Sequence, residues 1–326
     1  MLNLVMWVRV RVARLRARFD PLYRAKWRRI RAAQLAANLP YERGEKWSPQ
    51  VMSIEETLRD IIGNRRSVAR FGDGEFALVC GRKMLFENAN GELGRRLAEI
   101  LANPDPRCLV AICDVFGRLD GILPRDWTFW REVMQWAREG VCRALHADYR
   151  ATPPRLALGN AYISRPYMQV SDRTIAPRAF GLWKELVADK DLLIVEGRFS
   201  RLGVGNDLLS GAKSIRRIWC PPRGAFARYG EILAAVRAQA RPGDLVLLAL
   251  GATATVLAYD LAKSGLWAVD AGHVDVEYMW MKMGATDKVA IPGRYVSEVV
   301  GGQERCALEG ERERLNVVAT VGEAEK

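Results

Sequence analysis

The sequence is poor in the residues that build metal cages and disulfide frameworks. Its 326 residues include two histidines and six cysteines, and no two cysteines form a CxxC pair. A Cys/His zinc site is therefore not expected. Cysteines in apolar surroundings, such as Cys108 and Cys142, are expected to behave as small buried hydrophobes. The chain has no internal repeat and no low-complexity tract, so solenoid, fibrous and disordered classes are excluded.

Long apolar runs are also missing. No stretch approaches the roughly 18 apolar residues that a membrane-spanning helix needs. Arg9 and Arg11 interrupt the N-terminal apolar segment before it reaches the length typical of a secretory signal. We therefore expect a protein of the reducing cytoplasm.

Acidic residues are scarce at the N-terminus. The first 40 residues hold ten Arg or Lys and one acid, whereas the rest of the chain holds 40 basic and 37 acidic residues. Apolar residues at helical spacing over 4–22 predict a basic amphipathic N-terminal helix, and a second basic segment runs to about residue 37. Residues 1–37 fit the inner face of an anionic membrane, with the protein held there peripherally. They equally fit a helix that packs on the body or on a second subunit. Nucleic acid is disfavoured, because the near-neutral body offers no continuing basic groove.

The rest of the chain predicts an α/β fold. Residues 38–50 form a Pro- and Gly-containing linker, and Ser53 to Glu56 has capping-box spacing before a helix that ends near Gly63. Beyond it, continuously apolar strands alternate with helical patterns, as in a mainly parallel, Rossmann-like sheet with helices on both faces. We expect strands at 67–71, 108–113, 192–195, 215–220, 245–250 and 267–270, and helices at 94–102, 127–138, 225–240 and 253–263.

Two carboxylates follow the first of these strands. Ligands of parallel sheets bind at the carboxyl ends of the strands, so the residues just after each strand are the most informative. Asp73 and Glu75 are separated by one glycine, and Arg70 precedes them. Such oxygen ligands suit Mg²⁺ or Mn²⁺ beside a phosphate. The alternative is a surface turn in which both acids cap the next helix.

Glycine-rich junctions follow two later strands. After Val195 come three glycines, two arginines and an asparagine, whose backbone and side-chain donors can hold a diphosphate. The spacing is not the dinucleotide fingerprint, because Leu208 stands where the third glycine belongs. A long structural connection remains the alternative. Gly251 and Thr253 form a similar junction between another strand and a helix. Thr253 is expected to cap that helix or to contact a phosphate.

Two further segments carry polar groups. His273 follows a strand end, and Asp275 and Glu277 come two and four residues later. These groups are candidates for a catalytic base or an extension of the metal site, or else the two acids are first-turn residues favoured by the helix dipole. The segment with Asn160, Tyr162 and Arg165 suits a sugar or phosphate, or a hydrogen-bonded structural loop.

Taken together, these segments resemble the GT-D-type glycosyltransferases over roughly residues 67–280. Several matches in the same order carry the resemblance. They are Arg70-Phe-Gly-Asp-Gly-Glu-Phe, Asn160-Ala-Tyr-Ile-Ser-Arg-Pro-Tyr-Met, Val195-Glu-Gly-Arg-Phe-Ser-Arg-Leu-Gly-Val-Gly-Asn-Asp, Ala212-Lys-Ser-Ile, Ala249-Leu-Gly-Ala-Thr-Ala-Thr-Val-Leu-Ala-Tyr-Asp-Leu-Ala and Gly272-His-Val-Asp-Val-Glu-Tyr.

The resemblance implies a metal-dependent transfer of a hexose from a nucleotide diphosphate sugar, typically a UDP-sugar, to a glycan, lipid-linked or protein acceptor. The family's Asp-x-Glu metal motif falls on Asp73 and Glu75, with Mn²⁺ or Mg²⁺ as cofactor. Asn160, Tyr162 and Arg165 are assigned to the acceptor or the sugar. We assign the nucleotide sugar to Arg70, Gly72, Glu196, Gly197, Ser200, Arg201, Gly203, Gly205, Asn206, Gly251 and Thr253.

The expected organisation is a basic N-terminal segment and linker at 1–47, a transferase domain at 48–295 and a C-terminal tail at 296–326. Asp275 or Glu277 is the expected base that takes the proton of the acceptor hydroxyl, with His273 beside them. Two other functions fit the same residues. One is a metal-dependent phosphohydrolase that acts on nucleotide sugars, and the other is a non-catalytic, membrane-associated subunit that binds them.

Overall fold

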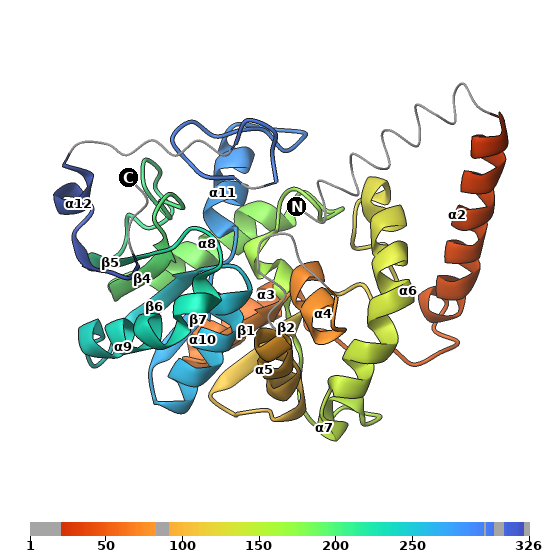
Figure 1. The fold of residues 1–326 in the computed structure, drawn as a ribbon, viewed down its shortest axis with the longest axis horizontal. Helices are drawn as coiled ribbons and strands as arrows, with labels where there is room; N and C mark the ends of the chain where they lie inside the picture. The colour runs from red at the N-terminus through yellow and green to blue at the C-terminus, as the bar shows by residue number, and fades with distance from the viewer. Residues whose placement is uncertain (1–20, 83–90, 297, 303–309, 323–326) are drawn as a thin grey trace.

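A single parallel sheet organises the molecule. The computed structural model describes residues 21–82, 91–296, 298–302 and 310–322. Within these residues the sheet has eight strands in the order β3-β2-β1-β7-β6-β4-β5-β8, and every neighbouring pair is parallel (Figure 1). The strands are β1 Ser67–Phe71, β2 Cys108–Ile112, β3 Gly159–Asn160, β4 Asp191–Gly197, β5 Ser214–Cys220, β6 Leu245–Ala249, β7 Trp267–Asp270 and β8 Val317–Thr320.

The central strands are apolar at successive positions because both of their faces are covered. In β4, Leu193 and Val195 pack into one buried cluster, whereas Leu192 and Ile194 pack into another. Side chains alternate between the two faces of a strand, so an unbroken apolar run supplies two cores at once.

Helices lie on both faces of the sheet (Figure 1). The apolar residues of α9 join the first cluster, those of α3 and α8 join the second, and α10 contributes to both. The predicted α/β class with a mainly parallel sheet is confirmed. The helices are α2 Pro21–Glu42, α3 Ile54–Asn64, α4 Asp73–Val79, α5 Gly91–Ala102, α6 Trp127–Ala144, α7 Ala147–Arg150, α8 Ile175–Val187, α9 Tyr229–Gln239, α10 Ala252–Lys263, α11 Val274–Lys282 and α12 Glu311–Arg314, with short 3₁₀ turns η1 Pro124–Asp126, η2 Ala161–Ser164 and η3 Ala225–Arg228.

The basic helix α2 packs against α6 through a mostly polar face. Arg131 of α6 pairs with Glu42 at 2.7 Å and accepts a hydrogen bond from Asn38 at its carbonyl, while the Arg138 guanidinium lies 3.9 Å from the ring centre of Tyr41. Helix α2 runs through Pro40 to Glu42, so the expected linker begins later than residue 38. The amphipathic helix predicted over 4–22 lies outside the described residues except at its last two positions.

The segment expected to be a C-terminal tail is part of the fold. Strand β8 extends the sheet beside β5, and Glu311 of α12 pairs with the buried Arg201 guanidinium. The tail prediction was therefore wrong for the described part of 296–326. Both β8 and the two-residue β3 escaped prediction because they are short. Among the described residues, no helix is long and apolar enough to cross a membrane.

Candidate active site

A cavity of about 260 Å³ lies where the strands end at their carboxyl termini. The chain leaves β4 toward β5 on one side and leaves β6 toward β7 on the other, so the sheet has a topological switch point between these two strands. Open α/β sheets bind ligands at such points. Of the predicted site residues, those that line the cavity are Arg70, Gly72, Asp73, Glu75, Tyr162, Arg165, Gly197, Ser200, Gly251, His273 and Asp275.

The two carboxylates of the predicted metal motif lie together in the first turn of α4. The Glu75 carboxylate reaches back and accepts a hydrogen bond from the Gly72 amide at 2.7 Å, which caps the helix. Asp73 lines the cavity and has no hydrogen bond or ion pair among the residues that the structure describes. Burial raises the pKa of both carboxyl groups, and the nearby positive charges of Arg165 for Asp73 and Arg70 for Glu75 oppose this rise. Glu75 therefore caps the helix, as in the capping interpretation, whereas Asp73 keeps oxygens that are free to bind a metal ion.

These residues fit a divalent cation that takes its other ligands from substrate and water. A desolvated carboxylate without a protein partner is stabilised by a cation, and Mg²⁺ is held by one or two carboxylates together with phosphate oxygens. In the described part of the chain, no group of three or more His, Cys, Asp or Glu side chains is arranged to hold a metal by itself. The donor set thus suits Mg²⁺ or Mn²⁺ shared with a phosphorylated substrate.

The positively charged Arg70 stabilises the Glu75 carboxylate of this pair. Its guanidinium lies 3.6 Å from Asp270 at the end of β7. It also packs on Gly272, where a Cβ atom would stand 2.2 Å from a terminal nitrogen of Arg70. Burial raises the pKa of both Asp270 and Glu75, and the positive charge of Arg70 opposes this rise. Arg70 lines the cavity, and it also stabilises two buried acids.

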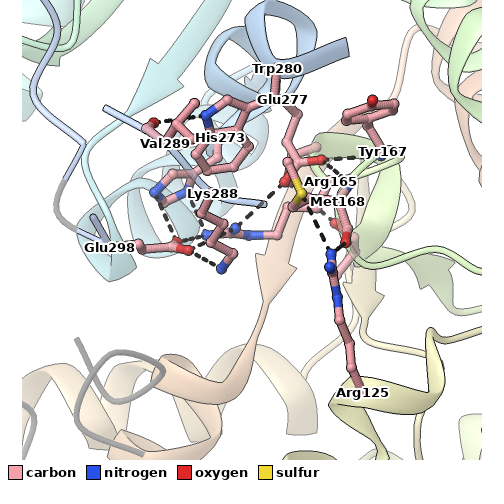
Figure 2. Close-up of polar contacts among 12 residues, drawn as sticks. Arg125, Arg165, Tyr167, Met168, His273, Glu277, Trp280, Lys288, Val289 and Glu298 are labelled. Carbon is pink, nitrogen blue, oxygen red and sulfur yellow. Dashed lines mark hydrogen bonds and ion pairs between the residues drawn. The ribbon is translucent and has the colours of Figure 1, made fainter. Parts of the chain in front are cut away.

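Arg165 is the centre of a charged cluster at the cavity wall (Figure 2). Its guanidinium pairs with Glu298 and lies 3.8 Å from Glu277. Lys288 pairs with the same Glu298 carboxylate. Burial acts to raise the pKa of Glu298, but the charges of Arg165 and Lys288 outweigh it and hold this pKa well below its usual range. Glu298 is therefore ionised, and its charge is matched by two cations.

His273 is held in one neutral form by this cluster. Its Nδ1 lies 3.0 Å from a guanidinium nitrogen of Arg165, and its Nε2 lies 3.3 Å from Glu298. A guanidinium can only donate, so Nδ1 accepts and Nε2 carries the proton that faces the carboxylate. Burial, reinforced by the Arg165 charge, lowers the pKa of His273 to about 3. Both ring nitrogens are thus engaged.

Glu277 does not line the cavity. Its side chain is fully buried, and one carboxylate oxygen accepts hydrogen bonds from the amides of Tyr167 and Met168 at 3.1 and 2.8 Å (Figure 2). The structure thus assigns it the task of fixing the loop that carries Arg165. The expectation that Glu277 takes the acceptor proton does not fit this placement.

Asp275 lines the cavity, but its oxygens are already paired. One accepts hydrogen bonds from the Gly203 amide and the Asn206 side chain at 2.8 and 2.7 Å. The other lies 3.1 Å from Arg294. Asp275 therefore anchors the glycine-rich loop to α11, and this engagement corrects its expected role as a free base.

Other predicted nucleotide contacts lie behind the cavity wall. Glu196 is buried, accepts a hydrogen bond from the Leu202 amide at 2.8 Å and pairs with Arg217. The Arg201 guanidinium pairs with Glu311 and donates to the Gly293 carbonyl. These side chains hold the loop in place, and the cavity lining does not include them.

The remaining predicted residues also lie outside the lining. Asn160 caps η2 by accepting a hydrogen bond from the Tyr162 amide at 2.9 Å, and its amide donates to the Met52 carbonyl. Thr253 is fully buried in the first turn of α10. Gly203 and Gly205 take positive φ in the glycine-rich loop, which lets that loop turn.

Several lining residues were missed by the sequence analysis. Trp130 lies in the helix expected over 127–138, for which no site residue was predicted, and Glu298 falls in the segment expected to be a tail. The missed polar or aromatic lining residues are Trp130, Gln169, Arg223, Tyr295 and Glu298. Arg223, Tyr295 and Glu298 belong to no local sequence motif, so no sequence signal marked them.

Comparisons with known proteins agree on one family. A family model described as the glycosyltransferase GT-D fold matches residues 68–299. The chain is 40% identical over 249 residues to the probable glycosyl transferase Gly of Streptococcus gordonii, and 35% identical over 274 residues to the glycosyltransferase GlyD of Streptococcus pneumoniae serotype 4. These matches cover 76% and 83% of this chain but 35% and 32% of the relatives. The chain therefore spans about a third of the length of these curated relatives.

Solved structures match over nearly all of their own length. One, described as the highly conserved domain of unknown function 1792 with a distinct glycosyltransferase fold, has a TM-score of 0.75 and 36% identity, and the match covers 90% of this chain and 100% of that one. Another, described as a new glycosyltransferase from Streptococcus sanguinis, has a TM-score of 0.73 and 37% identity, with 84% and 100% covered.

Proposed function

The chain belongs to the family of glycosyltransferases with the GT-D fold, and we propose that it transfers a hexose from a nucleotide diphosphate sugar to an acceptor hydroxyl. The donor is of the UDP-sugar class, and the acceptor is a glycan, free, lipid-linked or on a protein. The observation that carries this proposal is the unpartnered Asp73 carboxylate, which lines the same cavity as Arg165 and the glycine-bounded start of α10.

The glycine-bounded side of the cavity suits the nucleotide diphosphate. Gly197 ends β4, and Gly251, with φ of +56°, precedes the twelve-residue helix α10. Backbone N–H groups at the start of such a helix bind phosphate, and the absence of side chains at the glycines lets the ligand approach closely. At the same side the Arg223 guanidinium donates to the Tyr295 hydroxyl at 2.6 Å, which places a cation at the cavity wall.

Asp73 and Glu75 would hold the divalent ion, Mn²⁺ or Mg²⁺. When bound, the ion would neutralise the negative charge that grows on the departing diphosphate. Arg165, fixed by Glu298 and by the loop that Glu277 holds, adds a preorganised positive charge on the same wall. In the reaction, the bond from the anomeric carbon to the diphosphate oxygen breaks and a bond to the acceptor oxygen forms. The acceptor hydroxyl releases its proton to solvent, so the products are the glycosylated acceptor, the nucleotide diphosphate and a proton.

The test is a titration of the full chain with nucleotide diphosphate hexoses, with and without Mn²⁺, followed by calorimetry and by release of the nucleotide. We expect metal-dependent binding and faster turnover when an acceptor glycan is present. Asp73→Asn should abolish the metal dependence while the protein stays folded. Asp172→Asn, an exposed carboxylate away from the cavity, is the matched control. Turnover that acceptors never accelerate would favour a hydrolase, and no binding of any donor would refute the proposal.

We further propose that the N-terminal basic segment, predicted over 1–37, holds the protein peripherally at an anionic membrane surface. In the described part, Arg24, Lys26, Arg28 and Arg29 of α2 are all exposed, and Leu22 is 84% exposed. Basic residues near anionic lipid contribute about 1 kcal/mol each. This placement would bring the cavity close to lipid-linked acceptors.

A further inference from the structure

The cavity wall opposite the glycines contains buried polar atoms that the protein leaves unpaired. The Tyr162 hydroxyl and the Trp130 indole nitrogen have no hydrogen-bond partner, although each residue is only 2% exposed. Gln169 is 5% exposed, and its side-chain amide makes no hydrogen bond to any described residue. All three residues line the cavity. Buried polar groups in folded proteins nearly always find partners, so the two unpaired groups of Trp130 and Tyr162 on one wall require an explanation.

These groups come from the other half of the sheet. Trp130 lies on α6, Tyr162 lies on η2 directly after β3, and Gln169 lies in the following loop. The two rings contact each other edge to face, with centroids 6.4 Å apart. The glycines of the nucleotide side belong instead to β4 and β6. The carboxylate of Asp73, which begins α4 after the central strand β1, lies between these halves of the fold.

From this arrangement we propose that Trp130, Tyr162 and Gln169 bind the hydroxyl groups of the donor hexose and select which hexose is transferred. The inference rests on the proposed function. A pyranose presents several hydroxyls that both donate and accept, and an indole N–H, a phenol and an amide are the matching set. Burial raises the pKa of Tyr162 well above its usual value, so this hydroxyl keeps its proton and remains a donor.

The position favours the donor hexose over an acceptor sugar. The hexose is bonded to the diphosphate, so it must lie next to the groups that receive the departing charge, and Asp73 and Arg165 both act electrostatically on Tyr162. The three side chains are also no more than 5% exposed, which suits a single sugar ring held against the wall better than the end of a glycan that enters from outside. A site built to hydrogen-bond a hydroxyl strongly rejects a ligand that lacks it.

The experiment compares the affinity of the full chain for UDP-hexoses with its affinity for UDP, in Mn²⁺, by calorimetry. Wild type should bind its preferred UDP-hexose more tightly than UDP. Tyr162→Phe should weaken UDP-hexose binding about tenfold, the effect of one hydrogen bond, and leave UDP binding unchanged. Because the hydroxyl has no protein partner, Tm should not fall. Gln169→Met should act in the same direction.

Tyr259→Phe is the matched control, because the Tyr259 hydroxyl donates to the Asn103 carbonyl away from the cavity. It should lower Tm and leave both affinities unchanged. If Tyr162→Phe and Gln169→Met keep the full preference for the hexose, the inference is overturned while UDP binding upholds the proposed function. If the variants alter only the KM for the acceptor, the wall binds the acceptor sugar and the inference is wrong. If wild type binds no nucleotide, both proposals fail.

Discussion

His273 shows how one residue links the site to the stability of the molecule. Its neutral ring lies between Arg165 and Glu298, and burial lowers its pKa to about 3 in the folded protein. In the unfolded chain a histidine titrates near 6.5. Below about pH 6.5 the unfolded chain therefore takes up a proton that the folded chain resists, and stability is lost as the pH falls toward 3.

We predict that His273→Gln flattens this dependence. The variant should be less stable than wild type at pH 7, because it loses contacts with Arg165 and Glu298, but its Tm should fall less steeply between pH 7 and pH 5. Thermal unfolding by circular dichroism at several pH values measures both quantities. His146→Gln, which removes the chain's other histidine, is the control for the loss of a histidine elsewhere in the chain. Equal slopes for wild type and His273→Gln would contradict the neutral state assigned to His273.

For individual residues, the sequence predicted which positions line the cavity better than it predicted the role of each side chain. Asp73, Arg165 and His273 follow strand ends, so the parallel topology alone brings them together. Asp275 and Glu277 also come shortly after a strand end. Side chains two residues apart on a helix, however, point in directions about 200° apart. One of them therefore faces the cavity and the other faces a loop. Whether a buried carboxylate is free or paired depends on partners far along the chain, which a single sequence does not reveal.

Among the elements, the junction between β7 and α11 depends on a glycine. Gly272 has φ of +49°, and Arg70 packs where its Cβ would stand. Gly181 in α8 has ordinary backbone geometry and open space around it. The two positions thus form a matched pair of glycines, one that the fold requires and one that it does not.

We predict that Gly272→Ala lowers stability by about 2 kcal/mol or more, through backbone strain and displacement of Arg70. Gly181→Ala should raise stability by roughly 0.5–1 kcal/mol, because alanine favours a helix. Chemical denaturation measures both. Displaced Arg70 should also raise the pKa of Glu75 and weaken metal binding. A tolerated Gly272→Ala with unchanged metal affinity would contradict the close packing of Arg70.

Element prediction succeeded where burial on two faces leaves a strong pattern. Strands β1 and β7 have the predicted bounds, and β6 ends one residue earlier than expected. The short α4 was not among the expected helices, although the alternative interpretation of Asp73 and Glu75 placed both acids at the start of a following helix. Strand β8 has only four residues, is partly buried at the edge of the sheet, and lies in the segment that was expected to be a tail.

At the scale of the whole molecule, the concentration of basic residues in the N-terminal segment can be tested in solution. We predict that the full chain binds vesicles containing anionic lipid, and that binding weakens steeply as salt rises, since screening shortens the reach of surface charge. Removal of residues 1–37 should release the protein from the vesicles without loss of donor binding. Co-sedimentation measures both. Neutral vesicles serve as the control, and persistent binding after the deletion would contradict the role of the basic segment.

The pairing of Arg201 with Glu311 has a consequence for how the protein is made. The two residues are 110 positions apart, and both are buried. As the chain leaves the ribosome, the glycine-rich loop emerges long before its anionic partner, and β5 emerges long before β8 covers its edge. Until α12 has been made, the Arg201 guanidinium lacks the Glu311 carboxylate. A charge without its counter-charge is more stable in water than in the protein interior. The glycine-rich loop therefore gains this buried contact only after translation has passed residue 311, and a nascent chain that ends earlier would lack it.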